Sequence, residues 1–387
     1  MFDALRKKFD EAYGPSSYEP IQVFSPSRVN VIGEHIDYNG GSVLPCAIEI
    51  GTFAVARKND DNKLRLISGN FELGGEFDFP LPQVCDEGNG WMNYAFGVAK
   101  YIEEAGHLVG GADIYLEGNI PNGAGLSSSA SLELLLGEIF NLLYNEGKID
   151  KVDLVKIGMR TENDFIGLHT GIMDQFIIAL GKKDHAMLLN TGTLEYSYYP
   201  FVLGDNSLVI MSTNYRRELK DSKYNERRRE CDEALAILQK VKPAEALCDY
   251  GLEDLDLLDH IESPVVRNRA RHAIMENDRV AKAVDALASG NIEELGNLLK
   301  QSNDSLRDLY EVTGPYLDAI TKHANDHPAC LGARMTGAGF GGCAIAIVKD
   351  EGMEDFKDYV GQQYEKDTSI EATFISSGVA DGVKQVQ

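Results

Sequence analysis

The chain has 387 residues, of which 43% are hydrophobic, enough for two packed domains because single cores seldom exceed about 250–300 residues. Its formal net charge is −24, and the basic residues are scattered, so we expect no nucleic-acid or anionic-lipid partner. No apolar run approaches the roughly 20 residues that a membrane span needs, and residues 1–9 mix charges into a helical pattern unlike a signal peptide.

The six cysteines are widely spaced and form no paired motif, which is typical of a reducing compartment. We therefore predict a cytoplasmic protein that binds small molecules and acts as a monomer. A nucleotide triphosphate entering so acidic a protein would need local cations, backbone N–H groups or a metal ion, of which magnesium is the obvious candidate.

The first half of the chain opens with a short helix and continues as a region rich in strands. The hydrophobic pattern then predicts helices and strands in alternation. We expect strands at 21–24, 29–32, 52–56, 64–67, 71–79 and 112–116, and helices at 91–104, from 132 to 143, at 152–165 and at 173–180.

Strands return at 186–190, 194–199 and 208–212, and the pattern beyond them is mostly helical. We place a domain boundary there, giving domains 1–200 and 201–387, each of α+β class with a cleft between them. The second would hold helices at 218–239, 265–288 and 292–310 and strands at 333–336, 343–348 and 372–376, with residues 381–387 frayed.

Residues 121–130 form a glycine- and serine-rich turn between a strand and a long apolar helix. Glycines let backbone N–H groups converge on an anion, and a helix N-terminus adds partial positive charge. No lysine follows, so this is not the P-loop of nucleoside triphosphatases. The alternative is a simple helix-capping turn, which the three consecutive serines make less attractive.

Residues 25–41 carry Arg28 on a strand and then Glu34, His35 and Asp37 just before an Asn-Gly turn. Carboxylates and an imidazole match the donor and acceptor pattern of adjacent sugar hydroxyls, which suggests a polyol pocket. A polar hairpin end, with Asp37 supporting the turn, explains the same residues equally well.

Two further acidic residues have simple structural explanations when taken alone. Asp174 stands at the start of a predicted helix, where it would ordinarily be an N-cap. Glu162 lies in a helical stretch beside other charges, where a solvated side chain is expected. Their interpretation depends on the rest of the chain.

In chain order, residues 28–41, 123–131, 222–228 and 334–342 resemble motifs of the GHMP family of small-molecule kinases. The first segment is similar to the signature of the members that phosphorylate galactose. The segment 123–131, GAGLSSSAS, resembles the family's ATP loop. The resemblance implies a two-lobed α+β fold, ATP and galactose as substrates, and Mg²⁺ as cofactor.

The resemblance also implies roles for individual residues. Asp174 would be the catalytic base and Arg28 its partner that stabilises the transferring phosphoryl group. The sugar would contact Glu34, His35, Ile36, Asp37, Asp174 and Tyr224. ATP would contact Ser68, Gly123, Ala124, Gly125, Leu126, Ser127, Ser128 and Ser129, and the metal ligands would be Ser129 and Glu162. The glycine-rich segment 337–342 would support the nucleotide, although a hairpin turn is the simpler explanation.

The sequence departs from the family pattern at Ser27, where glycine is usual, and at His169 and Thr170, where bacterial members commonly have Asn-Cys. Ile36 stands where many bacterial members have threonine, and isoleucine at this position also occurs in relatives that phosphorylate N-acetylgalactosamine, so it does not decide between sugars. Two alternatives therefore stay open: a kinase for another galacto-configured sugar, and a sensor that binds sugar and ATP without catalysis.

Overall fold

The structure is a computed structural model that describes residues 1–121, 123, 125–168, 170–215 and 220–386. Its larger sheet has six strands in the order β13-β1-β3-β6-β4-β5. The sheet is mixed, because β4 runs parallel to β6 and the other pairs are antiparallel. The strands are β1 (Ile21–Asn30), β3 (Pro45–Lys58), β4 (Lys63–Ser68), β5 (Gly75–Asp78), β6 (Ala112–Gly118) and β13 (Lys384–Val386).

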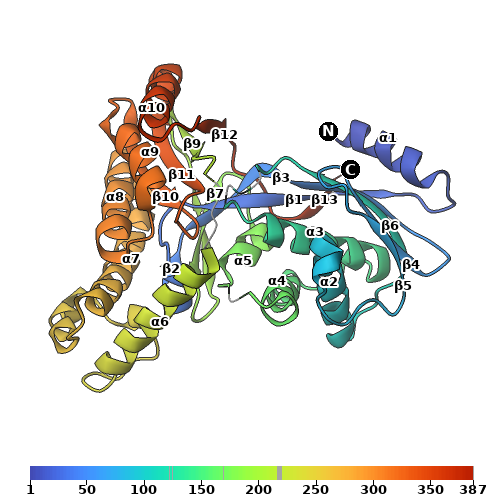
Figure 1. Cartoon of the computed structure of the whole chain (residues 1–387), viewed down its shortest axis with the longest axis horizontal. Helices are drawn as coiled ribbons and strands as arrows, with labels where there is room; N and C mark the ends of the chain where they lie inside the picture. The colour runs from blue at the N-terminus through green and yellow to red at the C-terminus, as the bar shows by residue number, and fades with distance from the viewer. Residues whose placement is uncertain (122, 124, 169, 216–219, 387) are drawn as a thin grey trace.

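Helices cover both faces of this sheet (Figure 1). Helix α1 (Phe2–Tyr13) lies on one face and packs Leu5 and Phe9 against Val55. On the opposite face, α3 (Ser128–Tyr144) and α5 (Met173–Leu180) pack against the strands, and α2 (Asn93–Glu104) and α4 (Lys151–Arg160) pack against α3. Because side chains alternate along a strand, Ala54 and Ala56 join the main core while Val55 faces α1.

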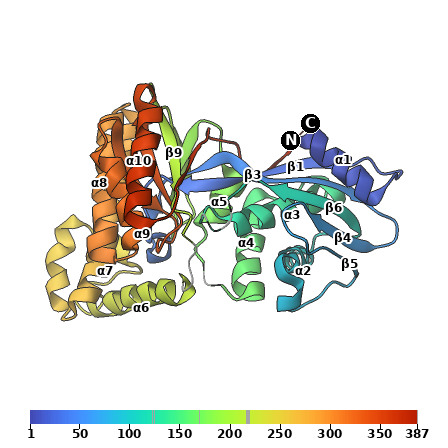
Figure 2. The same ribbon diagram turned by 45° about the horizontal axis from the view of Figure 1, so that its top comes forward.

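The second half of the chain builds a four-stranded antiparallel sheet in the order β10-β11-β9-β12. Its strands are β9 (Asn206–Ser212), β10 (Cys330–Thr336), β11 (Cys343–Lys349) and β12 (Thr373–Ser376). Helices α8 (Ile292–Ser305), α9 (Gly314–Asp326) and α10 (Met353–Thr368) lie beside this sheet, and α6 (Lys220–Leu238) and α7 (Pro264–Ala288) extend away from it (Figure 2).

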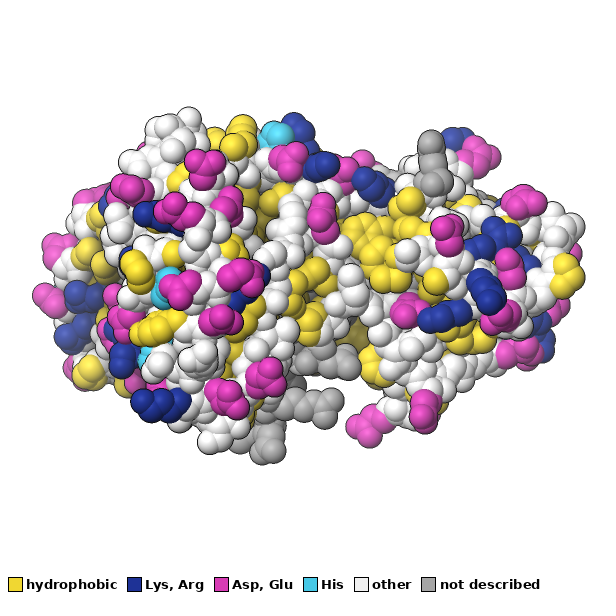
Figure 3. Space-filling model, turned by 90° about the horizontal axis from the view of Figure 1, so that it is seen from above, with side chains coloured by type: hydrophobic (Ala, Val, Ile, Leu, Met, Phe, Trp, Pro, Cys, Tyr) yellow, Lys and Arg dark blue, Asp and Glu magenta, His cyan; other side chains and the backbone are white. Residues whose placement is uncertain are grey.

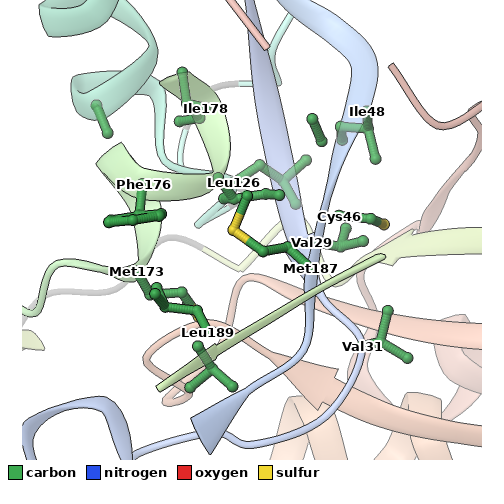
Figure 4. Packing of buried hydrophobic residues seen from close by; sticks show 14 of the residues in the cluster. Val29, Val31, Cys46, Ile48, Leu126, Met173, Phe176, Ile178, Met187 and Leu189 are labelled. Atoms are coloured by element: carbon green, nitrogen blue, oxygen red, sulfur yellow. The ribbon is translucent and has the colours of Figure 1, made fainter. Parts of the chain in front are cut away.

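A small third sheet, in the order β2-β7-β8, lies between the two halves of the molecule. It contains β2 (Ser42–Val43), β7 (His185–Asn190) and β8 (Tyr196–Pro200). Figure 4 shows how its side chains complete the core: Leu189 of β7 lies beside Met173 of α5, and Met187 of β7 lies near Val29 of β1. The segments that carry Arg28 and Asp174 therefore rest on one continuous hydrophobic core.

The short helical segments include two π-helices that extend longer helices. The segment η3 (Thr161–Ile166) follows α4, and η6 (Leu306–Tyr310) follows α8. The others are 3₁₀ segments: η1 (Asp37–Asn39), η2 (Glu87–Met92), η4 (Leu247–Asp249), η5 (Leu252–His260) and η7 (Asp350–Gly352). A π turn widens a helix and is frequent at functional sites.

The structure confirms most of the predicted elements whose hydrophobic pattern is strongly periodic. The α+β class is confirmed, and the helix at 173–180 has the expected bounds. The strands expected at 21–24 and 29–32 are one strand, β1, with an irregularity between Pro26 and Ser27. Helices α9 and α10 were not predicted, and the strand at 71–79 is reduced to β5.

The expectation that residues 381–387 fray is wrong for the described part of that segment. Lys384–Val386 pair with β1, and the Val383 N–H donates to the Ile178 carbonyl at 2.7 Å. The C-terminal end of the chain therefore returns to the first sheet, where backbone hydrogen bonds hold it.

Acidic and basic side chains are interspersed over the face shown in Figure 3. Among the residues that the structure describes, none of the helices combines the length and apolar character that a bilayer span demands.

Candidate active site

A cleft of about 660 Å³ brings together most of the residues that the sequence singles out. Its walls come from the end of β1 and the loop after it, the turn before α3, η3, the start of α5, α6 and the β10–β11 turn. The predicted site residues on its wall are Arg28, Glu34, His35, Asp37, Gly123, Gly125, Leu126, Ser127, Ser128, Ser129, Glu162, Asp174 and Tyr224.

Arg28 and Asp174 form a two-pronged ion pair on the cleft wall. Arg28 Nε donates to Asp174 Oδ1 at 2.6 Å and Nη2 donates to Oδ2 at 2.8 Å. The third nitrogen, Nη1, donates to the Gly125 carbonyl at 3.1 Å. Such a planar fork fixes direction as well as distance, so Arg28 orients the carboxylate and the glycine-rich turn together.

Asp174 is not the helix cap that its position in the sequence suggests. Helix α5 begins at Met173 and has no side-chain cap, while the Asp174 carboxylate accepts hydrogen bonds from Arg28 and from Ser127 Oγ. Its side chain is 28% exposed and that of Arg28 is 6% exposed, so the carboxylate faces the cleft and the guanidinium lies behind it.

The turn before α3 has the geometry of an anion site. Gly123, Gly125 and Ser127 all have positive φ, a backbone conformation that turns successive N–H groups toward one side. Ser127 precedes the helix, but its hydroxyl bonds to Asp174 and does not cap α3. The first N–H groups of α3 have no side-chain cap, and the helix dipole adds positive potential there.

Glu162 is buried and held by three side chains, so it is not a solvated charge. Its Oε1 accepts from Ser129 Oγ at 2.5 Å, and its Oε2 accepts from Thr170 Oγ1 at 2.7 Å and Gln175 Nε2 at 2.9 Å. Gln175 Nε2 also donates to Glu133 Oε2 at 3.1 Å. The π turn of η3 directs Glu162 into the cleft, with its Oε1 beside Ser129.

This oxygen-rich corner fits a hard divalent cation. A serine hydroxyl and a carboxylate oxygen are ligands that Mg²⁺ accepts, with water completing its octahedron. Among the described residues on the wall, one guanidinium, that of Arg28, faces four carboxylates, those of Glu34, Asp37, Glu162 and Asp174. A triphosphate in this cleft would therefore need a cation to offset the repulsion. No cluster of three acidic, histidine or cysteine ligands occurs among the described residues, so the protein offers a partial set.

Glu34 connects the loop after β1 to the second half of the chain. Its Oε1 accepts from the Gly337 N–H at 2.8 Å and Thr336 Oγ1 at 3.1 Å, and its Oε2 accepts from Asn30 Nδ2 at 3.1 Å. Arg334, which is fully buried, pairs with Oε1 at 3.1 Å. The carboxylate is thus fixed in direction, and Oε2 keeps capacity for another donor.

Asp37 lies on the same wall in an unusual environment. Burial, with the nearby Asp174 and Glu34 carboxylates, raises the pKa of Asp37 to about 7. Gly171 packs directly against it: a Cβ on Gly171 would come within 1.8 Å of Asp37 Oδ2. Glycine at 171 therefore leaves room for this carboxyl group.

Aromatic rings surround His35 at the end of the cleft that the loop after β1 lines. Its ring centroid lies 5.7 Å from that of Tyr224, on α6, and 5.0 Å from that of Tyr310. Burial is the main reason that the pKa of His35 falls to about 3, so the imidazole is neutral. Tyr224 reaches the cleft from the second half of the chain, as the resemblance implied.

Two predicted contact residues are not on the cleft wall. Ile36 is fully buried and packs beneath Gly41, because the turn that points Asp37 outward points Ile36 into the core. Ser68 ends β4 and its hydroxyl accepts from the Asn70 N–H at 3.2 Å. Ala124 and His169 lie outside the described residues.

Thr170, one of the departures from the family pattern, lies on the cleft wall and binds Glu162. The sequence analysis did not single out Gln175, which also binds Glu162, or Phe71 and Ile120, which add apolar surface to the wall. Gln175 follows Asp174 directly and could have been noted, but nothing in the local pattern distinguishes Phe71 from an ordinary turn residue. The segment 337–342 is a hairpin turn and also reaches the cleft, through Gly337 and Ala338.

Three family models match the chain: the GHMP kinases N terminal domain over residues 93–182, the galactokinase galactose-binding signature over 7–58, and the GHMP kinases C terminal over 283–366. The curated relatives include a galactokinase of Clostridium tetani, which is 50% identical across 99% of this chain and 97% of its own. A galactokinase of Streptococcus thermophilus is 49% identical across 98% of this chain and 97% of its own.

Among solved structures, a Lactococcus lactis galactokinase complexed with galactose superposes with a TM-score of 0.96 at 42% identity, covering 100% of both chains. The mevalonate kinase of Methanococcus jannaschii has a TM-score of 0.68 at 18% identity, covering 95% of this chain and 99% of its own, which shows a shared fold alone.

Proposed function

Because the chain belongs to the galactokinases, within the GHMP kinases, we propose that it transfers the γ-phosphoryl group of ATP to the C1 hydroxyl of α-D-galactose. The products are galactose 1-phosphate and ADP. The observation that carries the proposal is the Arg28–Asp174 pair, which lies against the glycine-rich turn inside the cleft.

Asp174 is the residue that faces the C1 hydroxyl in this proposal. As the hydroxyl oxygen attacks the γ-phosphorus, its proton passes to an Asp174 carboxylate oxygen and the bond to the ADP oxygen breaks. Arg28 keeps the carboxylate ionised and stabilises negative charge on the transferring group, although it also weakens Asp174 as a base. Alignment and charge neutralisation therefore carry most of the catalysis, as in other phosphoryl transfers.

We assign the phosphates of ATP to the turn at 123–129 and to the N-terminus of α3. Ser129 and Glu162 would hold Mg²⁺, which when bound offsets the charge of the terminal phosphates. Thr170 and Gln175 keep Glu162 oriented by occupying its other oxygen. Phe71 and Ile120 supply apolar wall beyond the turn, where we place the base of the nucleotide.

Glu34 and Asp37 would accept hydrogen bonds from sugar hydroxyls, with Tyr224 covering the sugar from α6. Carboxylates held in fixed directions discriminate between hydroxyl configurations, because a misplaced hydroxyl leaves a buried acceptor unpaired. Arg334 and the Gly337 N–H hold Glu34 in that direction.

The test is ADP release by the purified protein with galactose, N-acetylgalactosamine, arabinose, glucose and galacturonate, with and without Mg²⁺. We expect Mg²⁺-dependent turnover with galactose, and a product phosphorylated at C1. A preference for N-acetylgalactosamine would retain the mechanism and change the substrate. Saturable ATP binding without turnover on any sugar would favour a sensor over an enzyme.

We further propose that the protein acts as a cytoplasmic monomer without nucleic-acid or membrane partners. The thiols of Cys46, Cys85, Cys231, Cys248 and Cys330 are free, which suits a reducing compartment. Light scattering of the purified protein tests the oligomeric state.

A further inference from the structure

The imidazole of His35 has both ring nitrogens occupied by groups of the protein. Nε2 lies 3.2 Å from the carbonyl oxygen of Ala338, on the β10–β11 turn, and Nδ1 lies 2.8 Å from the hydroxyl of Tyr38. A carbonyl oxygen can only accept, so Nε2 carries the hydrogen. Because the buried ring is neutral, Nδ1 has no hydrogen and accepts from Tyr38.

The same reasoning extends through two more groups. The Tyr38 hydroxyl has one hydrogen, which it donates to His35, so its oxygen accepts from the Tyr310 hydroxyl at 2.8 Å. The Tyr310 hydroxyl then accepts from the thiol of Cys231, whose sulfur lies 3.1 Å away. The hydrogen bonds therefore run in one direction, from Cys231 through Tyr310 and Tyr38 to His35 and Ala338.

This chain of hydrogen bonds joins distant parts of the sequence. Cys231 lies on α6 and Tyr310 ends η6, while His35 and Tyr38 belong to the loop after β1. The main chain at Tyr310 is fixed as well, since its carbonyl accepts from Arg227 Nε at 2.7 Å.

A second histidine supports the same loop from the same side. The ring of His272 packs on Tyr310 with centroids 4.5 Å apart, and its Nε2 donates to the carbonyl of Glu34 at 3.1 Å. Side chains from the second half of the chain therefore hold the loop that carries Glu34 and Asp37.

We propose that Tyr310 is a positioning residue for the sugar-binding loop, and that the His35 ring locks this loop to Ala338 and does not bind a sugar hydroxyl. Neither Tyr38 nor Tyr310 lies on the wall of the cleft, so both act through His35. The inference rests on the proposed galactose site. In this proposal the His35 side chain holds the loop in place, instead of making the sugar contact that the family resemblance implies.

The kinetic test compares Tyr310→Phe, Tyr38→Phe and the double variant with the wild-type protein. Each single variant breaks the chain, so we expect the KM for galactose to rise roughly 3- to 10-fold, the effect of one lost hydrogen bond, with the KM for ATP unchanged. Because both variants break the same chain, the double variant should raise KM no further than the larger single effect. Additive effects, or an unchanged KM with lowered thermal stability, would overturn the proposal.

Tyr144→Phe is the matched control. Its hydroxyl donates to the Gly111 carbonyl at 2.6 Å, and Tyr144 ends α3, about 24 Å along the helix from the anion turn. It should lower stability without changing the KM for galactose. An equal rise in KM in this control would mean that general loosening explains the effect.

A second measurement does not depend on turnover. In ¹⁵N spectra of histidine-labelled protein, His35, assigned by loss of its signals in His35→Gln, should show a protonated Nε2 and a bare Nδ1, and Tyr310→Phe should shift the Nδ1 resonance. A protonated Nδ1 in the wild-type protein would refute the direction of the chain. If no sugar is phosphorylated but this tautomer is found, the proposed function fails and the hydrogen-bond assignment stands.

Discussion

At the scale of single residues, the cleft is organised by pairs whose partners are far apart in the sequence. Arg28 and Asp174 are separated by 146 positions, yet two hydrogen bonds join them. Pairing gives each group an orientation that neither would have alone, and this is what phosphoryl transfer requires of its acceptor side.

The variant Asp174→Asn tests the central pair. It keeps the size of the side chain and removes the charge, so we expect kcat to fall about 10²–10⁴-fold while ATP binding is largely retained. Asp113→Asn is a suitable control, because Asp113 is also paired with arginine, here Arg57 and Arg65, but is buried outside the cleft. The control should lose stability and keep kcat; substantial residual activity in Asp174→Asn would contradict the assignment.

Asp37 is expected to make sugar binding depend on pH. Its pKa is raised to about 7, and its ionised form accepts stronger hydrogen bonds than its neutral form. The KM for galactose should therefore fall as pH rises through about 7. Steady-state kinetics between pH 5.5 and about 8.5 check this, and Asp37→Asn should bind sugar more weakly with little remaining pH dependence. A wild-type KM that does not change in this range would rule out the role.

At the scale of elements, buried polar groups connect α3, η3 and α5 behind the proposed metal ligands. Gln175 on α5 donates to Glu133 on α3 and to Glu162 on η3. Glu133 is fully enclosed, and burial together with the nearby Glu162 carboxylate raises its pKa well above the usual range. The helices thus pack around a carboxyl group that favours its neutral form.

Replacing Glu133 with Gln should change the pH dependence of stability. A carboxyl group whose pKa is raised on folding contributes stability below its unfolded pKa and loses it as pH rises through the folded pKa. For one proton, the free energy of unfolding falls by at most about 1.4 kcal/mol per pH unit. The variant Glu133→Gln has no carboxyl group at this position, so its stability should not fall for this reason. Urea unfolding measures this at pH 5 and pH 8. The free energy of unfolding of Glu133→Gln, relative to that of the wild-type protein, should be higher at pH 8 than at pH 5. An equal change with pH in both proteins would contradict the assignment.

At the scale of the whole molecule, the C-terminal segment ties the ends of the chain together. After β12 it crosses back, and hydrogen bonds at Ala380, Gly382 and Val383 attach it to β3, to Gly181 and to α5 before β13 pairs with β1. It therefore supports β1, which carries Arg28, and α5, which carries Asp174, together with β3, the strand that pairs with β1 (Figure 1). A division at residues 200 and 201 remains a prediction, which limited proteolysis would test.

A graded truncation measures what this segment contributes. A chain that ends at Val383 lacks only β13, whereas one that ends at Ser376 also loses the buried Val379 and Val383. Burying a valine stabilises by about 1.5–3 kcal/mol, so the longer deletion should lower Tm by at least about 4 °C. The shorter deletion should lower Tm by a smaller amount. Equal Tm values for all three chains would show that the segment is dispensable.

Local pattern predicted much of the fold because periodicity reports which face of an element is buried. The helix at 173–180 and the strand at 64–67 are confirmed with nearly their expected bounds. Residues 384–386 were expected to fray, because the short segment has no periodic pattern and is held by pairing with β1, more than 350 positions earlier. Pairing of that kind leaves no signal in the local sequence.

The sequence by itself determined the chemical inventory of the cleft: a glycine- and serine-rich turn, a cluster of carboxylates and one arginine, in family order. Only the tertiary structure decided how they are paired. It brought Arg28 to Asp174 and Glu162 to Ser129, and it buried Ile36 while placing Asp37 on the cleft wall. The physical reason is that side-chain type is encoded locally, whereas orientation and pKa depend on neighbours that long-range packing supplies.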